Sequence, residues 1–296
     1  MIRRSLMVVA MLAAGLTFTG AALQAEVVAK YNFNGRTASG TITLRSCSAS
    51  FPYNGEEYVP NKASGECGPT LENPGAGGEQ RGYYRSSFNN SGSEESKGRE
   101  TLFLDCKHGY FLDSYRSKGE GVLPAKGSFT WEIVVRIDRF SGTDNCGILL
   151  DATKGEVMEV NWDGKAVATR LWMAWKDPGK APAKGDPFLL DFSVPSDDNN
   201  KVVNISTELK IGEWYSIAAV YDDAEHNMML YVNGELKASA DAISAPDRGT
   251  GFGIAGFGPQ AAPIKHAMYF QRGDIDGIAF SNEALTPDKF VFPVKK

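Results

Sequence analysis

The chain has 296 residues, of which 42% are hydrophobic and 23% charged, and its 36 acidic residues outnumber its 31 basic ones. Without residues 1–25, which hold two arginines and no acid, the formal net charge is 29 − 36 = −7. A mildly acidic, dispersed surface argues against nucleic-acid binding, which needs a clustered positive face. No stretch after residue 25 is apolar enough to predict a transmembrane segment.

Residues 1–25 predict a secretory signal peptide. Arg3 and Arg4 precede an apolar stretch over residues 6–16, and small residues lead to Ala25. This stretch is shorter than the roughly 20 residues of a spanning helix, so an uncleaved membrane anchor is the less favoured alternative. The sequence therefore predicts a secreted protein, located in a periplasm, at a cell surface or outside the cell, with a mature chain over residues 26–296.

The four cysteines predict disulfide bonds, because an exported protein with an even number of cysteines commonly pairs them. They are Cys47, Cys67, Cys106 and Cys146. Three pairings are possible, and we favour Cys47 with Cys67 and Cys106 with Cys146. No two cysteines have the close spacing of a zinc site, and four reduced buried thiols are the less favoured alternative.

The first part of the mature chain predicts two short strands, residues 26–33 and 40–44. Residues 68–99 are rich in Gly, Ser, Asn and Glu and have little apolar surface with which to order themselves. We therefore expect a long polar surface loop there. A domain boundary is the alternative, but the segment that precedes it is too short to hold a core of its own.

The rest of the chain predicts strands throughout. Residues 128–138 alternate between an apolar face that begins with Phe129 and Trp131 and a polar face that includes Glu132, Arg136 and Asp138. The other predicted strands are residues 101–105, 109–112, 156–162, 165–175, 188–192, 214–221, 229–232 and 273–280, with hairpin turns at Asp163-Gly164 and Asn233-Gly234. There is no sustained helical period and no internal repeat. The sequence predicts an all-β fold with one antiparallel β-sandwich.

Seven segments in this order resemble the laminin G-like jelly rolls of the concanavalin A-like lectin/glucanase superfamily. They are YNFNG, LFLDCKHGYF, GSFTWEIVVRI, GEWYSIAAVYD, MMLYVNGELKA, GFGIAGF and GDIDGIAFSNEALT. The resemblance covers nearly the whole of residues 26–296, except residues 68–99. It implies two antiparallel sheets, one of them concave. It does not imply one function, because this fold carries lectins, adhesive modules, glucanases and lyases.

The resemblance also implies a structural calcium site at Asp276. Alternation would place Asp276 on one face with Ile278 and Phe280, and a buried carboxylate is costly unless it is paired or binds a metal. Related domains use the matching aspartate for Ca²⁺; Asp274 and oxygens near Asn34 could complete the shell. The alternative is an aspartate that accepts hydrogen bonds from backbone amides.

The acid motifs of the family's glucanases, E-x-D-x-x-E and E-x-D-x-E, are absent from this chain. Catalysis of glycoside cleavage needs two converging carboxylates. A hydrolase or lyase alternative would use Glu132, Arg136 or Glu159, but a cross-strand salt-bridge ladder explains Glu132 and Arg136 better. We therefore expect a non-catalytic module, with an enzyme or a structural, adhesive surface component as the alternatives.

Tryptophans are the candidate ligand-binding residues. Trp162 lies at a predicted hairpin tip, whereas Trp172 and Trp175 are three positions apart and should face opposite sides of a strand. Trp162 with one of that pair could form a platform for a sugar ring, and Trp131 and Trp214 are predicted to be core. The expected partner is an extracellular glycan, with a protein surface as the second possibility.

Two short motifs carry no function. Residues 251–256 spell GxGxxG, but no strand–turn–helix pattern surrounds them, so nucleotide binding is not expected. Arg272-Gly273-Asp274 spells an integrin tripeptide, but the strand pattern already explains these residues.

Overall fold

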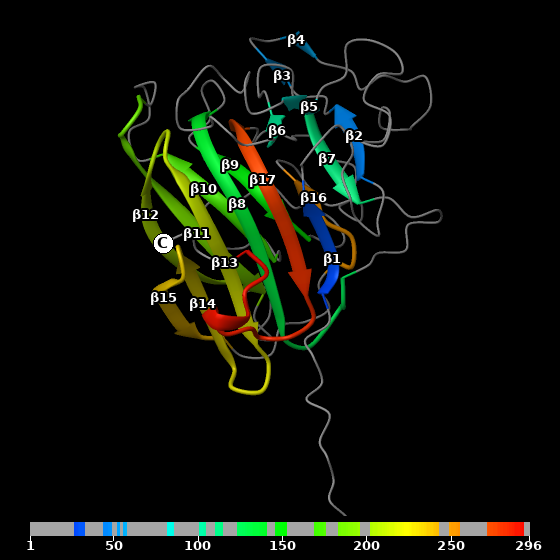
Figure 1. Ribbon diagram of the computed structural model, residues 1–296, viewed down its shortest axis with the longest axis vertical. Coiled ribbons are helices and arrows are strands. Elements are labelled where there is room, and N and C mark those ends of the chain that lie inside the picture. The colour runs from blue at the N-terminus through cyan, green and yellow to red at the C-terminus, as the bar shows by residue number, and fades with distance from the viewer. Residues whose placement is uncertain are drawn as a thin grey trace, which may run out of the picture.

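The computed structural model shows two β-sheets packed face to face (Figure 1). It describes residues 27–32, 44–48, 52–53, 56–57, 82–85, 101–104, 110–114, 123–140, 146–152, 169–175, 183–195, 202–242, 249–254 and 271–292. Within these residues nearly every element is a strand, which confirms the predicted all-β sandwich. The same residues contain no helix with the length and apolar character needed to cross a bilayer.

Sheet A has the strand order β15-β14-β13-β8-β17-β6-β5, and β1 pairs with β17 beside this path. All of its pairings are antiparallel. Its strands are β1 (Val27–Asn32), β5 (Gly82–Arg85), β6 (Thr101–Leu104), β8 (Phe129–Phe140), β13 (Trp214–Asp222), β14 (Asn227–Val232), β15 (Glu235–Asp241) and β17 (Gln271–Ser281). β5 lies inside the segment predicted to be a loop; its two tyrosines favour a strand.

Sheet B has the strand order β12-β11-β10-β9-β16-β7-β2 and is also antiparallel. Its strands are β2 (Leu44–Ser48), β7 (Tyr110–Ser114), β9 (Cys146–Asp151), β10 (Arg170–Trp175), β11 (Pro187–Pro195), β12 (Val202–Lys210) and β16 (Gly253–Ile254). A separate pair joins β3 (Pro52–Tyr53) and β4 (Glu56–Glu57), and a 3-10 helix, η3 (Pro287–Lys289), follows β17.

The core lies between the inner faces of the two sheets. Alternation in β8 points Phe129 and Trp131 inward, as predicted, and both are buried. Phe129 packs edge to face against Phe192 of β11, with ring centroids 6.1 Å apart. The ring centroids of Phe280 of β17 and Phe252, which precedes β16, are 4.3 Å apart. Because aromatic rings bury large apolar areas, these contacts between the sheets are a main source of stability.

Strand β17 contains a β-bulge that changes which residues face the core. Its register with β8 shifts between Ile275 and Gly277, so Asp276 is the extra residue. Ile275, Ile278 and Phe280 are consequently buried in the core, while Asp276 is only half-buried. The expectation that Asp276 shares one face with Ile278 and Phe280 by simple alternation is therefore wrong.

The hairpin between β14 and β15 is the turn predicted at Asn233-Gly234. Both residues have positive φ angles, 52° and 77° respectively, and Val232 pairs with Glu235 across the two-residue loop. Two positive φ angles are the requirement of a type I′ turn, which matches the twist of the flanking strands. The other predicted hairpin, at Asp163-Gly164, lies outside the described residues.

Candidate functional site

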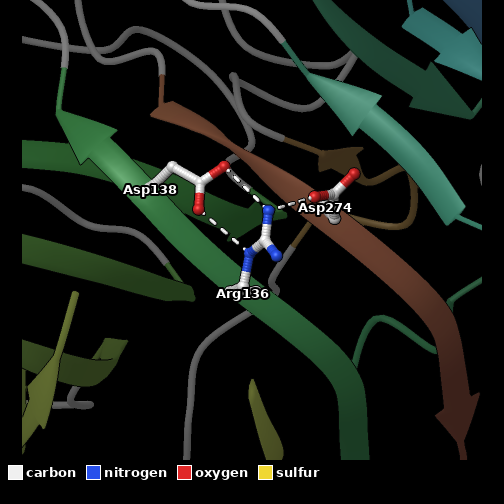
Figure 2. A network of polar contacts seen from close by, with 3 residues as sticks. All are labelled: Arg136, Asp138 and Asp274. Carbon is white, nitrogen blue, oxygen red and sulfur yellow. Dashed lines mark hydrogen bonds and ion pairs between the residues drawn. The ribbon is translucent and has the colours of Figure 1, made fainter. Parts of the chain in front are cut away.

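The outer face of sheet A carries an ion network centred on Arg136 (Figure 2). The Arg136 Nη2 atom lies 2.7 Å from Asp274 Oδ2, and the Arg136 Nε atom lies 2.9 Å from Asp138 Oδ1. Arg136 and Asp138 come from β8, whereas Asp274 comes from β17 and is in register with Arg136. Arg136 therefore makes a cross-strand ion pair, but its partner is Asp274, and the printed hydrogen bonds of Glu132 are to backbone amides, so the predicted ladder of Glu132 and Arg136 does not form as expected. Asp274, the last residue of the integrin tripeptide, is fully buried.

Trp214 lies beside this network and not in the core, contrary to prediction. It pairs with Arg136 across β13 and β8, so both side chains point outward. The Arg136 guanidinium carbon is 5.8 Å from the centroid of the indole ring, within the range of a cation–π contact. Tyr215, the next residue, is the one that faces the core.

Glu132 anchors the C-terminal segment, residues 282–292, on the same face of sheet A. Its carboxylate accepts hydrogen bonds from the backbone amides of Val291, at 2.9 Å, and Phe292, at 3.0 Å. Burial raises the pKa of Glu132, and these two hydrogen bonds with the charge of Lys30 offset part of the effect. Both carboxylate oxygens thus accept backbone hydrogen bonds from the C-terminal segment, which leaves Glu132 poorly placed for acid–base catalysis. Glu159, the other candidate acid, lies outside the described residues.

Further contacts hold this C-terminal segment in place. The Thr130 hydroxyl donates to the Glu283 carbonyl at 2.7 Å and accepts from the Leu285 amide at 2.9 Å. Farther along, Phe290 packs edge-on against Tyr231 with ring centroids 5.3 Å apart. The segment, red in Figure 1, therefore covers the centre of sheet A.

The outer face of sheet B presents a different arrangement, which begins with Trp172 of β10. Leu171, Met173 and Trp175 face inward and are buried, whereas Trp172 faces outward and is half-buried. Trp172 and Trp175 thus lie on opposite faces, as predicted. Trp175 is 8% exposed and packs in the core, which leaves Trp172 as the member of the pair that could form the predicted platform with Trp162. Trp162 lies outside the described residues.

Asp191 is the carboxylate nearest to Trp172 in the sheet register. It pairs with Trp172 across β10 and β11, and with Ser206 across β11 and β12, so the three side chains share the outer face. Asp191 is 8% exposed. Burial raises the pKa of Asp191 from 3.8 to about 6, and a hydrogen bond with Ser206 acts in the opposite direction.

An ion pair lies next to Trp172 on the same face of β10. The Arg170 Nε atom is 2.7 Å from Asp151 Oδ1, and the Ser193 hydroxyl donates to the Arg170 carbonyl at 3.3 Å. Arg170 and Trp172 are two positions apart on β10 and therefore point the same way. We call Trp172, Asp191, Ser206, Arg170 and Asp151 the outer cluster of sheet B.

The outer cluster combines the groups with which proteins recognise sugars. An indole face can stack on the C–H face of a pyranose ring, and a carboxylate and a hydroxyl can exchange hydrogen bonds with its hydroxyl groups. Sequence reasoning identified Trp172 but missed Asp191. The available signal was a single acid inside the apolar strand PFLLDFSV, where a charge needs a specific reason.

Two of the three residues proposed for a metal, Asp274 and Asp276, lie in the described part of the chain. In the described part of the chain, no group of three or more His, Cys, Asp or Glu side chains could hold an ion. Asp274 is engaged by Arg136, so it fits an ion pair better than a metal site. Asp276 is half-buried next to Gly277, which pairs with Asn32 at the end of β1. Asn34 follows two positions later, outside the described residues.

The sheet order limits the possible disulfides. Cys47 is on β2 and Cys146 is on β9, with β7 and β16 between them. Three inter-strand spacings separate the two residues by about 14 Å, and bridged Cα atoms lie within about 7 Å. A bond between Cys47 and Cys146 is thus excluded, and the favoured pairing stays a prediction because Cys67 and Cys106 lie outside the described residues.

Solved structures share the fold at low sequence identity. The binding domain of botulinum neurotoxin DC in complex with rat synaptotagmin II has a TM-score of 0.51 and 10% identity, over 88% of this chain and 49% of that one. The same toxin's binding domain in complex with SialylT has a TM-score of 0.50 and 8% identity, over 89% and 49%. The chain therefore spans about half the length of these domains.

A carbohydrate-binding module is also similar. The Ruminococcus gnavus IT-sialidase CBM40 bound to alpha2,3 sialyllactose has a TM-score of 0.40 and 14% identity, over 56% of this chain and 80% of that one. No curated protein sequence matches the chain. A laminin G family model matches residues 113–289, which is more than half of the sequence and includes both sheets' central strands. The chain belongs to the concanavalin A-like lectin/glucanases superfamily.

Proposed function

We propose that this protein is an exported binding module that recognises an extracellular glycan on the outer face of sheet B. The observation that carries the proposal is the outward, half-buried indole of Trp172 directly opposite the Asp191 carboxylate. A protein surface is the second candidate ligand. The fold is compatible with both, since the two botulinum neurotoxin domains were solved with a protein and with SialylT respectively.

The outer cluster would bind a sugar through two kinds of contact, stacking on Trp172 and hydrogen bonds to Asp191. Trp172 would supply apolar stacking area with little loss of side-chain entropy, because an indole has only two rotatable bonds. Asp191 would orient the ring by accepting hydrogen bonds from its hydroxyl groups. The carboxylate has capacity for this, because it can accept about four hydrogen bonds and Ser206 provides one.

The contacts of Glu132 and Arg136 favour binding over catalysis by these residues. Glu132 receives two backbone amides of the C-terminal segment, and Arg136 is engaged by two aspartates. A catalytic acid or base needs access to the substrate bond. We therefore assign these side chains to the stability of sheet A.

A glycan array tests the proposal, with the purified protein, Trp172→Ala and Trp214→Ala compared side by side. Both tryptophans are half-buried and point outward, but from different sheets. Each variant therefore shows what the loss of an outward indole does when it is removed from the other sheet. We expect selective binding by the wild type and by Trp214→Ala, and loss of the signal in Trp172→Ala. Binding that survives in Trp172→Ala and disappears in Trp214→Ala would move the site to sheet A.

We propose that a structural calcium ion is held at Asp276, with Asn34 as a further ligand. The support is that Asp276 lies on the bulge of β17 and that its neighbour Gly277 pairs with Asn32. Ca²⁺ prefers several oxygen ligands, including backbone carbonyls, which a bulge and a loop can supply. Calcium should raise the melting temperature of the wild type but not of Asp276→Asn. Equal melting temperatures in calcium and in chelator would rule the site out.

Export by the leader at residues 1–25 is part of the same proposal. Glycans of cell surfaces and matrices lie outside the cytoplasm, so a protein that binds them must be transported. Fractionation with N-terminal sequencing would locate the mature protein. A product that starts near Glu26 supports export, whereas an intact leader in the cytoplasmic fraction contradicts it.

A further inference from the structure

We infer that the outer cluster of sheet B selects uncharged glycans and discriminates against acidic ones, such as sialylated or sulfated sugars. The inference rests on the proposed glycan-binding function and specifies its ligand class. It follows from the charges that β10 and β11 place beside Trp172: Arg170 is paired with Asp151, whereas Asp191, the carboxylate directly opposite the indole, is hydrogen-bonded to the neutral Ser206.

The cation nearest to Trp172 on β10 is already paired. Arg170 lies two positions before Trp172 on the same face, and its Nε atom is 2.7 Å from Asp151 Oδ1. Both partners are buried, so the pair is held in a medium of low dielectric. A ligand carboxylate would have to compete with Asp151 for Arg170, and success would leave a buried carboxylate without its partner.

The groups around the indole on the other two strands are acidic or neutral. Asp191 faces Trp172 directly, and Ser206 stands behind it on β12. Glu208 follows on the same face of β12, because it pairs with Leu189, two positions from Asp191. Lys210 is exposed at the end of β12, four positions or about 13 Å from Ser206.

Asp191 is suited to hydroxyl groups and unsuited to anions. With a pKa raised to about 6 by burial, it is ionised at pH 7.5 and then acts only as a hydrogen-bond acceptor. A sugar hydroxyl can donate to it, whereas a second carboxylate or a sulfate has no proton to donate. Two like charges within about 6 Å repel enough, at an effective dielectric constant near 20, to weaken binding by about tenfold or more.

Matched glycan pairs test this inference at pH 7.5, where N-acetyllactosamine-type neutral glycans are compared with the same glycans carrying one terminal sialic acid or one sulfate. We expect the wild type to bind the neutral member at least about tenfold more tightly. Asp191→Asn keeps the size of the side chain and removes its charge. It should reduce this preference several-fold, mainly through better binding of the acidic member.

Asp241→Asn is the control, because it removes an exposed carboxylate from β15 of sheet A. It should leave the preference unchanged. Equal binding of both members, tighter binding of the acidic member, or a neutral preference that Asp191→Asn does not alter would overturn the inference while leaving glycan binding itself intact. Binding to no glycan of any pair would instead overturn the proposed function, and the inference with it.

Discussion

The side chains of Arg136 and Asp274 form a buried ion pair between the two central strands of sheet A. The Nη2–Oδ2 distance is 2.7 Å, and the two side chains are 1% and 0% exposed. Asp138, which is 24% exposed, binds the same guanidinium from the solvent side. A buried charge is tolerated only when it is fully paired, so the network ties β8 to β17 at one fixed register.

Asp274→Ala should lower the free energy of unfolding by about 3 kcal/mol, because it removes the fully buried carboxylate that pairs with the buried Arg136 guanidinium. Asp138→Ala should cost only about 1 kcal/mol, because its partly exposed carboxylate interacts through solvent of high dielectric. Urea unfolding of both variants measures the difference. Equal losses would show that the network does not depend on the buried partner.

Gly273→Ala should be among the most destabilising single-methyl additions in the chain. A Cβ atom at this position would lie 2.1 Å from the carbonyl oxygen of Arg136, which is backbone and cannot move aside. We expect a loss of about 3 kcal/mol or more. Gly127→Ala is the control: it has open space but a φ of +84°, and should cost about 1 kcal/mol. Thermal melting would compare them, and similar melting temperatures would contradict the close approach of β17 to β8.

Glu132→Gln should loosen the C-terminal segment. The amide group retains one acceptor oxygen but turns its NH₂ toward the second backbone donor, so one of the amides of Val291 and Phe292 loses its partner. The expected loss is about 1–2 kcal/mol. Hydrogen exchange at Val291 and Phe292 should accelerate, whereas Glu235→Gln, an exposed acid on β15, should leave it unchanged. Unaltered protection in Glu132→Gln would remove Glu132 from this role.

Asp191 should make the protein less stable as the pH rises. Its pKa is about 6 in the folded protein and close to 3.8 when unfolded, so between these values the folded state binds more protons. The stability that this carboxyl contributes is complete below pH 4 and is lost as the pH rises through about 6. The free energy of unfolding of Asp191→Asn, relative to that of the wild type, should therefore rise by about 2 kcal/mol between pH 4 and pH 7.

Thermal melting from pH 4 to pH 7.5 measures this effect, with Asp241→Asn as the control for an exposed acid. The difference between Asp191→Asn and the wild type should grow across the range, while the control difference stays flat. A difference that shrinks with rising pH would mean that the Asp191 carboxylate is stabilised, and not penalised, by its surroundings.

The fold could be predicted from the sequence because apolar alternation and the residues that favour turns are local features. The apolar face of β8 and the Asn233-Gly234 turn follow directly from residue order. The bulge at Asp276 was not predictable from the strand pattern. One extra residue changes which sheet face the preceding side chains point to, and the amino-acid composition gives no sign of it. Trp214 and Tyr215 show the same limit, since adjacent aromatic residues do not reveal which one enters the core.

The outer cluster of sheet B was predictable only in part. The three-residue spacing of Trp172 and Trp175 placed one of them outward. That Asp191 stands opposite Trp172 depends on the pairing register of β10 with β11, which is set by long-range packing and not by either strand alone.

Titration calorimetry with the best glycan from the array tests the central claim most directly, using the wild type, Trp172→Ala and Trp214→Ala at equal concentrations. The account predicts that Trp172→Ala weakens binding by about tenfold or more, because the stacking surface is lost, while Trp214→Ala binds like the wild type. Wild-type affinity in Trp172→Ala would contradict a glycan site on the outer face of sheet B.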